Sequence, residues 1–195
     1  MSITLEDFER RLAEAGGGAL NRLLRSELLR AALFAEGKAK LRVTGGNPLH
    51  TRSGRLRSSI RSGIRGPTAQ GFLEGYLQAG GTSSRGQVKY ARIHEEGGTI
   101  VPKNKKFLTI PVGPAKTGAS VARVSARQVP GLAYVQSLKG QPLLAHQDTG
   151  AVWFILRKRV EIPKRPFLAP SIRDAAKQLP AALAPLLARS LRADL

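Results

Sequence analysis

The stretch VKYARIHEEGGTIVPKNKKFLTIP, residues 88–111, decides the fold. Its first part predicts a short helix, which the double glycine Gly97-Gly98 ends abruptly because glycine adopts backbone angles that other residues avoid. A hairpin is expected to follow, made of a strand, the basic turn 103–106 and a second strand from Phe107 to Val112. The glycine break lets that second strand enter the sheet.

The side chains of this stretch divide into two groups. We expect Tyr90, Ile93 and Phe107 to pack in the core, because they are the large apolar residues of the helix and the second strand. We expect Glu95 and Glu96, together with the turn Lys103–Lys106, to face neighbouring proteins. The two glutamates are candidates for pairing with arginine, either within the fold or across a contact between subunits.

A counterpart of the central stretch follows at residues 160–168, where a strand leads through Pro163 and Pro166 into the last helix. Proline suits the first turn of a helix, so the helix is expected to start after Pro166. Apolar residues then recur at helical spacing as far as Leu186, but two prolines interrupt the pattern. A kink or division is therefore predicted near Gln178.

The N-terminal region is predicted to be helical. Residues 4–7 fit a capping box, and apolar residues continue at helical spacing until the three glycines 16–18 interrupt them. The apolar face resumes at Leu20 and predicts a long amphipathic helix that ends near Val43. Packing of this helix on its own sheet and packing on a partner both remain open.

Strands are expected in the middle of the chain. Residues 51–65 alternate between helical and strand patterns, and we interpret them as a helical turn over 53–59 followed by a strand through Ile64. A turn at residues 66–67, a returning strand over 72–78 and a loop over 80–86 complete this part.

Residues 113–130 lack a firm period and predict an extended loop or hairpin excursion that serves as an arm for binding a partner. Three strands are predicted after it, over residues 132–138, 142–146 and 151–160, and the last has apolar residues on both faces, as a central strand does. The fold class is therefore α+β, a mostly antiparallel curved sheet flanked by a long N-terminal helix and a kinked C-terminal helix. We interpret residues 1–195 as a single domain with a helical region over 1–45, a sheet region over 51–165 and a helical region over 166–195.

The charge is strongly one-sided. The chain has 32 Lys and Arg against 13 Asp and Glu, a net charge of +19. Residues 37–73 contain eight basic and no acidic residues, and residues 97–147 contain seven basic and no acidic residues. Such a field favours a polyanionic or acidic partner, although a solvated basic surface without a dedicated ligand is the alternative.

Sequence motifs for catalysis are absent. The chain has no cysteine, which excludes disulfides and thiolate metal sites, and it contains no nucleophile elbow, phosphate-binding loop or dinucleotide fingerprint. His94 has two carboxylates beside it, but neighbouring residues on a helix point in different directions, so the three side chains do not converge on one ion. We expect no enzymatic activity, no cofactor and no metal. No apolar run of membrane-spanning length and no signal peptide is recognisable, and no membrane partner is expected.

The basic residues are candidates for contact with a partner or with DNA. Aromatic residues are not interleaved among them, so contact with the phosphate backbone is a better hypothesis than recognition of bases. The candidates are Arg52, Arg55, Arg57, Arg61, Arg65, Lys103, Lys105, Lys106, Arg123 and Arg127.

Three stretches together carry a resemblance to a known family. They are TRSGRLRSSI at 51–60, YARIHEEGG at 90–98 and IPKRPFL at 162–168. In this order the chain resembles the virion morphogenesis proteins of tailed bacteriophages, the neck, tail-completion or minor tail proteins at the junction of head and tail. The resemblance spans about residues 50–175, and its structural positions are Tyr90, Ile93, Gly97, Gly98, Phe107, Pro163, Arg165, Pro166 and Phe167.

The resemblance implies a structural role in the virion. It implies a homo-oligomeric ring, hexameric in copy number, that joins head to tail and lets the genome pass without reading its sequence. The partners would be the head connector and the tail-terminator or tail-tube proteins, and the location would be the virion neck, with the host cytoplasm during assembly. The alternative is a basic nucleic-acid-binding protein that contacts the phosphate backbone.

Overall fold

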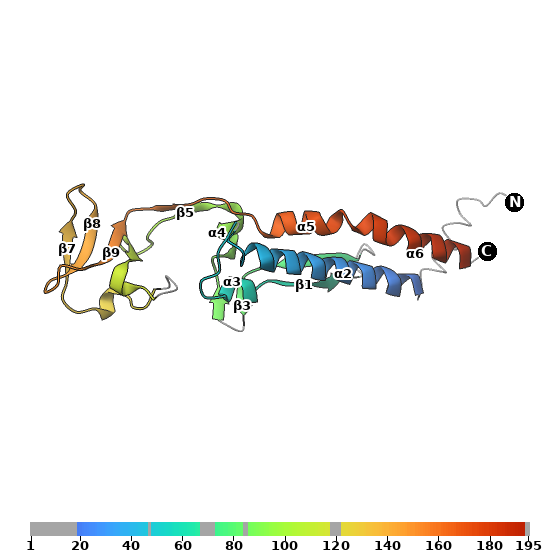
Figure 1. Ribbon diagram of the computed structural model, residues 1–195, viewed down its shortest axis with the longest axis horizontal. Coiled ribbons are helices and arrows are strands. Elements are labelled where there is room, and N and C mark those ends of the chain that lie inside the picture. The colour runs from blue at the N-terminus through green and yellow to red at the C-terminus, as the bar shows by residue number, and fades with distance from the viewer. Residues whose placement is uncertain (1–18, 47, 67–72, 84–85, 118–121, 194–195) are drawn as a thin grey trace.

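The computed structural model shows an elongated chain with helices at one end and a small sheet at the other (Figure 1). It describes residues 19–46, 48–66, 73–83, 86–117 and 122–193. The predicted capping box at residues 4–7 and the glycine interruption at 16–18 lie outside these ranges. Two short extended strands, β5 and β10, connect the two ends of the molecule.

Helix α2 (Ala19–Arg42) is the predicted long amphipathic helix. Its buried face consists of small residues, with Ala32, Ala35 and Ala39 at most 7% exposed. Small side chains allow close approach of the neighbouring elements, and α2 packs against strands β1 and β2 on its own chain and against the C-terminal helices. Of the two packings left open by the sequence, the intramolecular one is thus present.

The C-terminal helix is divided, as predicted. Helix α5 (Leu168–Ala176) and helix α6 (Leu179–Ala193) are separated at residues 177–178, and α6 contains Pro185. Both lie alongside α2 and run in the opposite direction (Figure 1). An ion pair between Arg42 and Asp174 at 3.0 Å joins the end of α2 to α5.

Two antiparallel hairpins accompany these helices. Helix α3 (Arg55–Ser58) is the predicted helical turn, and strand β1 (Arg61–Arg65) pairs with strand β2 (Glu74–Gln78). The next pair, β3 (Gly81–Ser83) with β4 (Gly86–Val88), falls where the sequence predicts a loop. That prediction was wrong for the described residues, because glycine and serine composition favours turns but does not prevent backbone pairing.

The central stretch forms a helix followed by two strands that do not pair with each other. Helix α4 (Ala91–Glu96) leads into β5 (Gly98–Ile100), which pairs antiparallel with β10 (Val160–Ile162). The second strand, β6 (Leu108–Pro111), pairs instead with β9 (Val152–Arg157). The expected hairpin is therefore wrong: β5 and β6 take their partners from residues 152–162, where the sequence predicts a strand over 151–160.

The distal sheet has the strand order β6-β9-β8-β7. Strand β7 (Leu132–Gln136) and strand β8 (Pro142–His146) form a hairpin, and β9 is an interior strand, as its apolar pattern predicts. The predicted excursion at 113–130 contains two short 3-10 turns, η1 (Gly113–Ala115) and η2 (Ala126–Gln128). Its described part folds back on its own sheet, because Ala115 is fully buried and its carbonyl accepts a hydrogen bond from the Arg123 amide.

The main core lies where α2, the 49–60 region and the start of α5 meet. It contains Ala39, Val43, Leu49, Ile60 and Phe167. The expectation that Tyr90 belongs to the core is wrong, since it is 38% exposed. Ile93 and Phe107 are half-buried, and Phe107 precedes β6 at the distal end, so these residues do not share one core. The α+β class with antiparallel strands, a long N-terminal helix and a divided C-terminal helix is confirmed.

Candidate interaction site at the junction of three stretches

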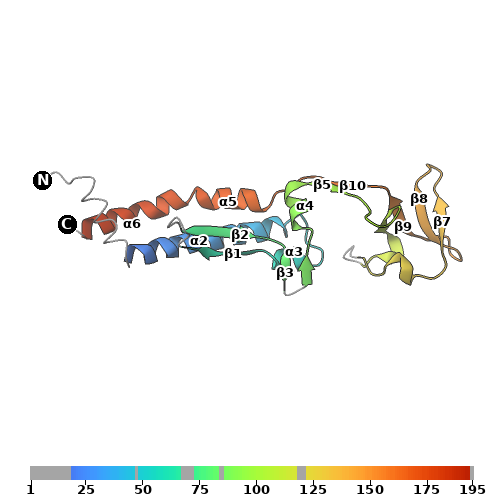
Figure 2. The same ribbon diagram turned by 180° about the vertical axis from the view of Figure 1, so that it is seen from behind.

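The three stretches that carry the resemblance lie together at one junction between the helical end and the β5–β10 connection. Figure 2 shows α4 at the point where β5 and β10 leave the helices. The backbone amide of Arg165 donates a hydrogen bond of 2.8 Å to the carbonyl of His94. The stretch 51–60 reaches the same place because its Ile60 and Phe167 of the stretch 162–168 share the main core.

Glu95 holds this junction together. Its carboxylate, at the end of α4, accepts hydrogen bonds from three successive backbone amides at the start of α5: Phe167 at 2.7 Å, Leu168 at 2.9 Å and Ala169 at 2.9 Å. No side chain of α5 caps this end. One carboxylate thus satisfies amides that lack partners in the first helical turn, and its charge complements the positive end of the helix dipole.

Gly97 allows the backbone at the end of α4 to approach the backbone of residues 162–164 closely. Its backbone angles, φ 76° and ψ 176°, fall in a region that is almost exclusive to glycine. A Cβ atom at this position would lie 2.9 Å from the backbone nitrogen of Lys164 and 3.2 Å from the carbonyl oxygen of Ile162. Glycine is therefore required twice, for its conformation and for the space that its missing side chain leaves to the strand beside it.

A basic cavity of about 500 Å³ opens at this junction. Its arginines come from the 50–57 region and from the segment after β10, His94 of α4 lies between them, and none of the lining residues is acidic. Apolar side chains from the core form part of the wall. The charged, titratable and hydroxyl-bearing lining residues are His50, Thr51, Arg52, Ser53, Arg55, Arg57, Tyr90, His94 and Arg165.

Three exposed arginines of the cavity are placed to contact a ligand. Arg55, Arg57 and Arg165 are exposed, and none of the ion pairs among the described residues involves them. Several guanidinium groups around one concavity create a positive potential that is focused by the low-dielectric wall. Their planar donor groups match carboxylate and phosphate oxygens.

His94 records the electrostatic character of the cavity. Burial lowers the pKa of His94 below its usual value, and the positive charge of Arg165 lowers it further. Its Nδ1 atom is buried without a hydrogen-bond partner, and its ring contacts Tyr90 edge to face at 5.7 Å between centroids. The imidazole is therefore neutral at neutral pH and adds no positive charge to that of the arginines.

The carboxylates beside His94 do not join it in a site. Glu95 binds the α5 amides, whereas Glu96 pairs with Arg92 on its own helix at 2.7 Å. This divergence follows the prediction that neighbouring helical residues point apart. Glu95 is engaged within its own chain, and a contact between subunits remains a prediction for Glu96, whose side chain is 57% exposed.

The other predicted contact residues are spread along the molecule. Arg61 lies near the carbonyl of Thr82 at 3.5 Å, and the guanidinium of Arg65 lies over the ring of Tyr76 at 4.4 Å. The lysines 103, 105 and 106 are exposed between β5 and β6. Arg123 and Arg127 are exposed on the segment that folds against the distal sheet. The structure thus brings Arg52, Arg55 and Arg57 together but leaves the other candidates apart.

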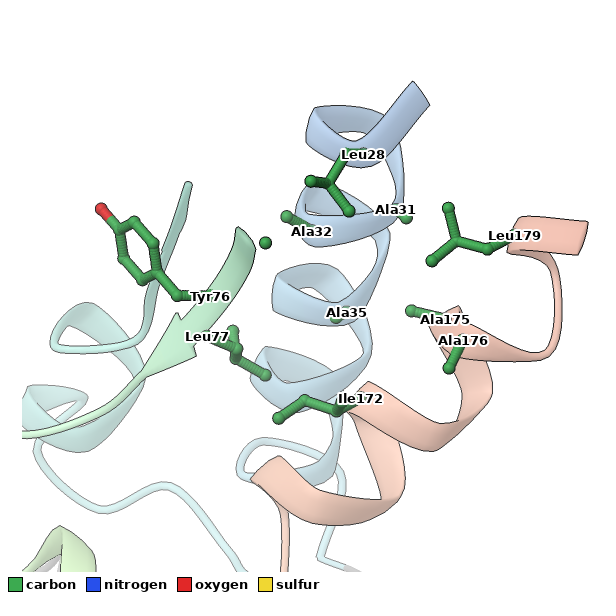
Figure 3. A pocket seen from close by; sticks show the side chains of 11 residues that line it. Leu28, Ala31, Ala32, Ala35, Tyr76, Leu77, Ile172, Ala175, Ala176 and Leu179 are labelled. Atoms are coloured by element: carbon green, nitrogen blue, oxygen red, sulfur yellow. The ribbon is translucent and has the colours of Figure 1, made fainter. Parts of the chain in front are cut away.

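A second cavity lies in the helical end and has a different character. Figure 3 shows it between α2, β2 and α5, with Leu28, Ala35, Leu77 and Ile172 around it. Its volume is about 80 Å³. The hydroxyl of Tyr76 points away from it in Figure 3. This space is an apolar packing gap, and its side chains supply no group that could carry out chemistry.

The described residues contain no cluster of three His, Asp or Glu side chains that could hold a metal ion. No helix within the described ranges is long and apolar enough to cross a membrane. Sequence reasoning missed the cavity itself, although the acid-free window 37–73 was a signal for part of its wall. Comparison of the chain with protein-family models, with curated proteins and with solved structures finds no match.

Proposed function

We propose that this protein is a structural component of a tailed-bacteriophage virion, which forms a hexameric ring at the junction of head and tail. In this proposal the ring binds the head connector on one side and the tail-terminator or tail-tube proteins on the other. DNA passes through it without recognition of sequence. The protein acts in the virion neck and is present in the host cytoplasm during assembly.

One observation carries the proposal: the three stretches that resemble the phage family are far apart in sequence and meet at one junction. Residues 51–57 line the same cavity as Tyr90, His94, Ile162 and Arg165, and Glu95 fastens α4 to the start of α5. Their resemblance therefore concerns one place in the molecule rather than three unrelated turns. A place of this kind, held by backbone hydrogen bonds and lined by exposed arginines, suits a contact between proteins.

The elongated shape supports the same role. The helical end and the distal sheet lie at opposite ends of the molecule (Figure 1), so one subunit can contact neighbours at two levels of an assembly. Exposed apolar residues are also present at the distal end, including Tyr134, which is 55% exposed, and Leu138, which is fully exposed. Such residues favour burial against another protein.

Electron microscopy and mass photometry of the purified protein, alone and mixed with head-connector and tail proteins of the same virus, test the proposal. We expect closed rings of six copies, formed either by the protein alone or on the surface of a connector. Persistence as a monomer in every mixture, together with absence from purified virions, would overturn the proposal.

A nucleic-acid-binding function is the second candidate, because arginines 55, 57 and 165 have no carboxylate partner among the described residues. It predicts tight binding of duplex DNA without any virion partner, and an affinity that falls steeply with salt. A binding titration at two salt concentrations separates the candidates. A ring component needs no such affinity outside the assembled particle.

A further inference from the structure

We infer that the basic cavity at the junction is a binding pocket for an acidic peptide segment that carries an apolar side chain next to its carboxylates. The inference rests on the proposed function only for the source of the peptide, a neighbouring virion protein. Binding itself is a property of the isolated chain. The two claims can therefore fail separately.

The charge of the cavity selects an anion. Arg55, Arg57 and Arg165 come from two separate segments and line one concavity. The lining contains no acidic residue that could neutralise them within the subunit. A carboxylate can accept two parallel hydrogen bonds from one guanidinium group, so two or three acidic side chains can be bound at once.

The wall of the cavity selects a peptide over nucleic acid. Val43 and Leu49 are buried core residues, Leu56 and Ile162 are half-buried, and all four line the cavity. An apolar side chain would gain free energy by covering the partly exposed Leu56 and Ile162, whereas the sugar-phosphate backbone offers no comparable group. Tyr90 is the aromatic residue of the lining, and stacking platforms for bases use a series of aromatic rings.

The volume agrees with this ligand. A space of about 500 Å³ falls within the usual range for small-ligand pockets and can hold a few side chains rather than a helix or a duplex. His94 stays neutral in the empty cavity. An entering carboxylate meets guanidinium groups and the imidazole of His94, whose protonated form it stabilises. Binding of the acidic peptide is therefore linked to proton uptake at His94.

Fluorescence anisotropy with the intact protein tests the inference. The probe is a labelled peptide with glutamates on both sides of one leucine. Three comparison ligands accompany it: the same peptide with glutamine in place of glutamate, the same peptide with serine in place of leucine, and a short DNA duplex. All titrations are made at about 0.15 M salt, which screens long-range attraction.

A matched pair of variants separates the pocket from the general positive charge. The double variant Arg55→Gln/Arg165→Gln removes two charges inside the cavity, and Lys103→Gln/Lys105→Gln removes two charges outside it. We expect the first to weaken the glutamate–leucine peptide by about tenfold or more, since each charge-assisted hydrogen bond is strong, and the second by less than about threefold. The serine peptide should bind about three- to tenfold more weakly than the leucine peptide.

Three results would overturn the inference. Equal losses in the two double variants would show attraction by net charge alone. Equal binding of the glutamine peptide would exclude a carboxylate site. A greater loss of affinity for the DNA duplex than for the peptide in the double variant Arg55→Gln/Arg165→Gln would identify the cavity as a phosphate site.

A measurement on the unmodified protein covers the case in which the cavity variant does not fold. The ring proton resonances of His94, followed by NMR, should titrate at higher pH when the glutamate–leucine peptide is present, because a carboxylate stabilises the imidazolium. The glutamine peptide should cause no such shift. An unchanged His94 titration at saturating glutamate peptide would overturn the inference. Rings without peptide binding would refute the pocket alone, whereas peptide binding without assembly would refute the proposed function alone.

Discussion

Glu95→Ala is expected to destabilise the protein strongly, because this carboxylate caps a helix that begins 73 residues later in the sequence. The substitution leaves the amides of Phe167 and Leu168 without partners in a partly buried place, whereas the exposed amide of Ala169 can turn to water. A hydrogen bond to a charged group contributes about 1.5–3 kcal/mol. Loss of two such bonds lowers the free energy of unfolding by about 3–6 kcal/mol.

Glu96→Ala is the matched control for this substitution. It removes the neighbouring carboxylate of the same short helix, which pairs with Arg92 at the surface. An exposed pair of this spacing contributes about 0.3–0.5 kcal/mol. Urea unfolding followed by circular dichroism measures both variants. In thermal unfolding Glu95→Ala should lower the melting temperature by roughly 6–24 °C for a protein of this size.

Local opening in Glu95→Ala is expected at the start of α5. Amide hydrogen exchange should accelerate at residues 167–169 in Glu95→Ala and stay unchanged there in Glu96→Ala, since local opening is governed by local hydrogen bonds. Unfolding free energies of the two variants within about 0.5 kcal/mol of each other would refute the cap as the element that holds the junction.

The remaining predictions concern the same junction. Gly97→Ala should cost about 2–4 kcal/mol more than Gly140→Ala in urea unfolding, because both glycines have positive φ but a Cβ at Gly140 meets open space; equal costs would exclude the close approach to Lys164. Phe167→Ala should cost about 3–5 kcal/mol in the same assay, since its side chain is fully buried, and a cost below about 1 kcal/mol would contradict its place in the core. Because the pKa of His94 is lower when folded than when unfolded, the unfolded chain binds the proton more readily, so stability should fall as pH decreases below about 6.5. His94→Asn should remove that part of the pH dependence in urea titrations at several pH values, and an unchanged dependence would assign it elsewhere.

Local patterns identified most elements of this fold. The apolar period from Leu20 predicts α2, and the turn residues around Pro142–His146 predict β8 with its bounds. Both elements are decided by periodicity and by the residues that end them, which are local in sequence. The division of the last helix follows equally from its prolines.

Pairing between distant strands could not be predicted in the same way. Nothing local distinguishes a hairpin over 98–111 from two strands that each pair with residues 152–162, because the pairing is decided by long-range register. The role of Glu95 was hidden for the same reason. An acidic residue at a helix end predicts exposure, and its actual partners are backbone amides of a helix that is distant in sequence.

The candidate site was visible in part. The acid-free window 37–73 contains Arg52, Arg55 and Arg57, and the composition already favours an anionic partner there. Arg165, which completes the cavity, belongs to a separate stretch and joins it through the hydrogen bond between its amide and the carbonyl of His94. The concavity is a property of the folded junction and leaves no signal in the sequence.

Photocrosslinking from the rim of the cavity identifies what the cavity binds during assembly. Tyr90 lines the cavity and is 38% exposed, so the substitution Tyr90→benzoylphenylalanine keeps the first aromatic ring and places a reactive benzoyl group at the opening, where there is access to solvent. The protein is irradiated during assembly with its virion partners, and mass spectrometry identifies the attached segment. We expect the attached segment to be an acidic segment of a neighbouring virion protein. Crosslinks to DNA, or to no partner in assembled particles, would contradict it.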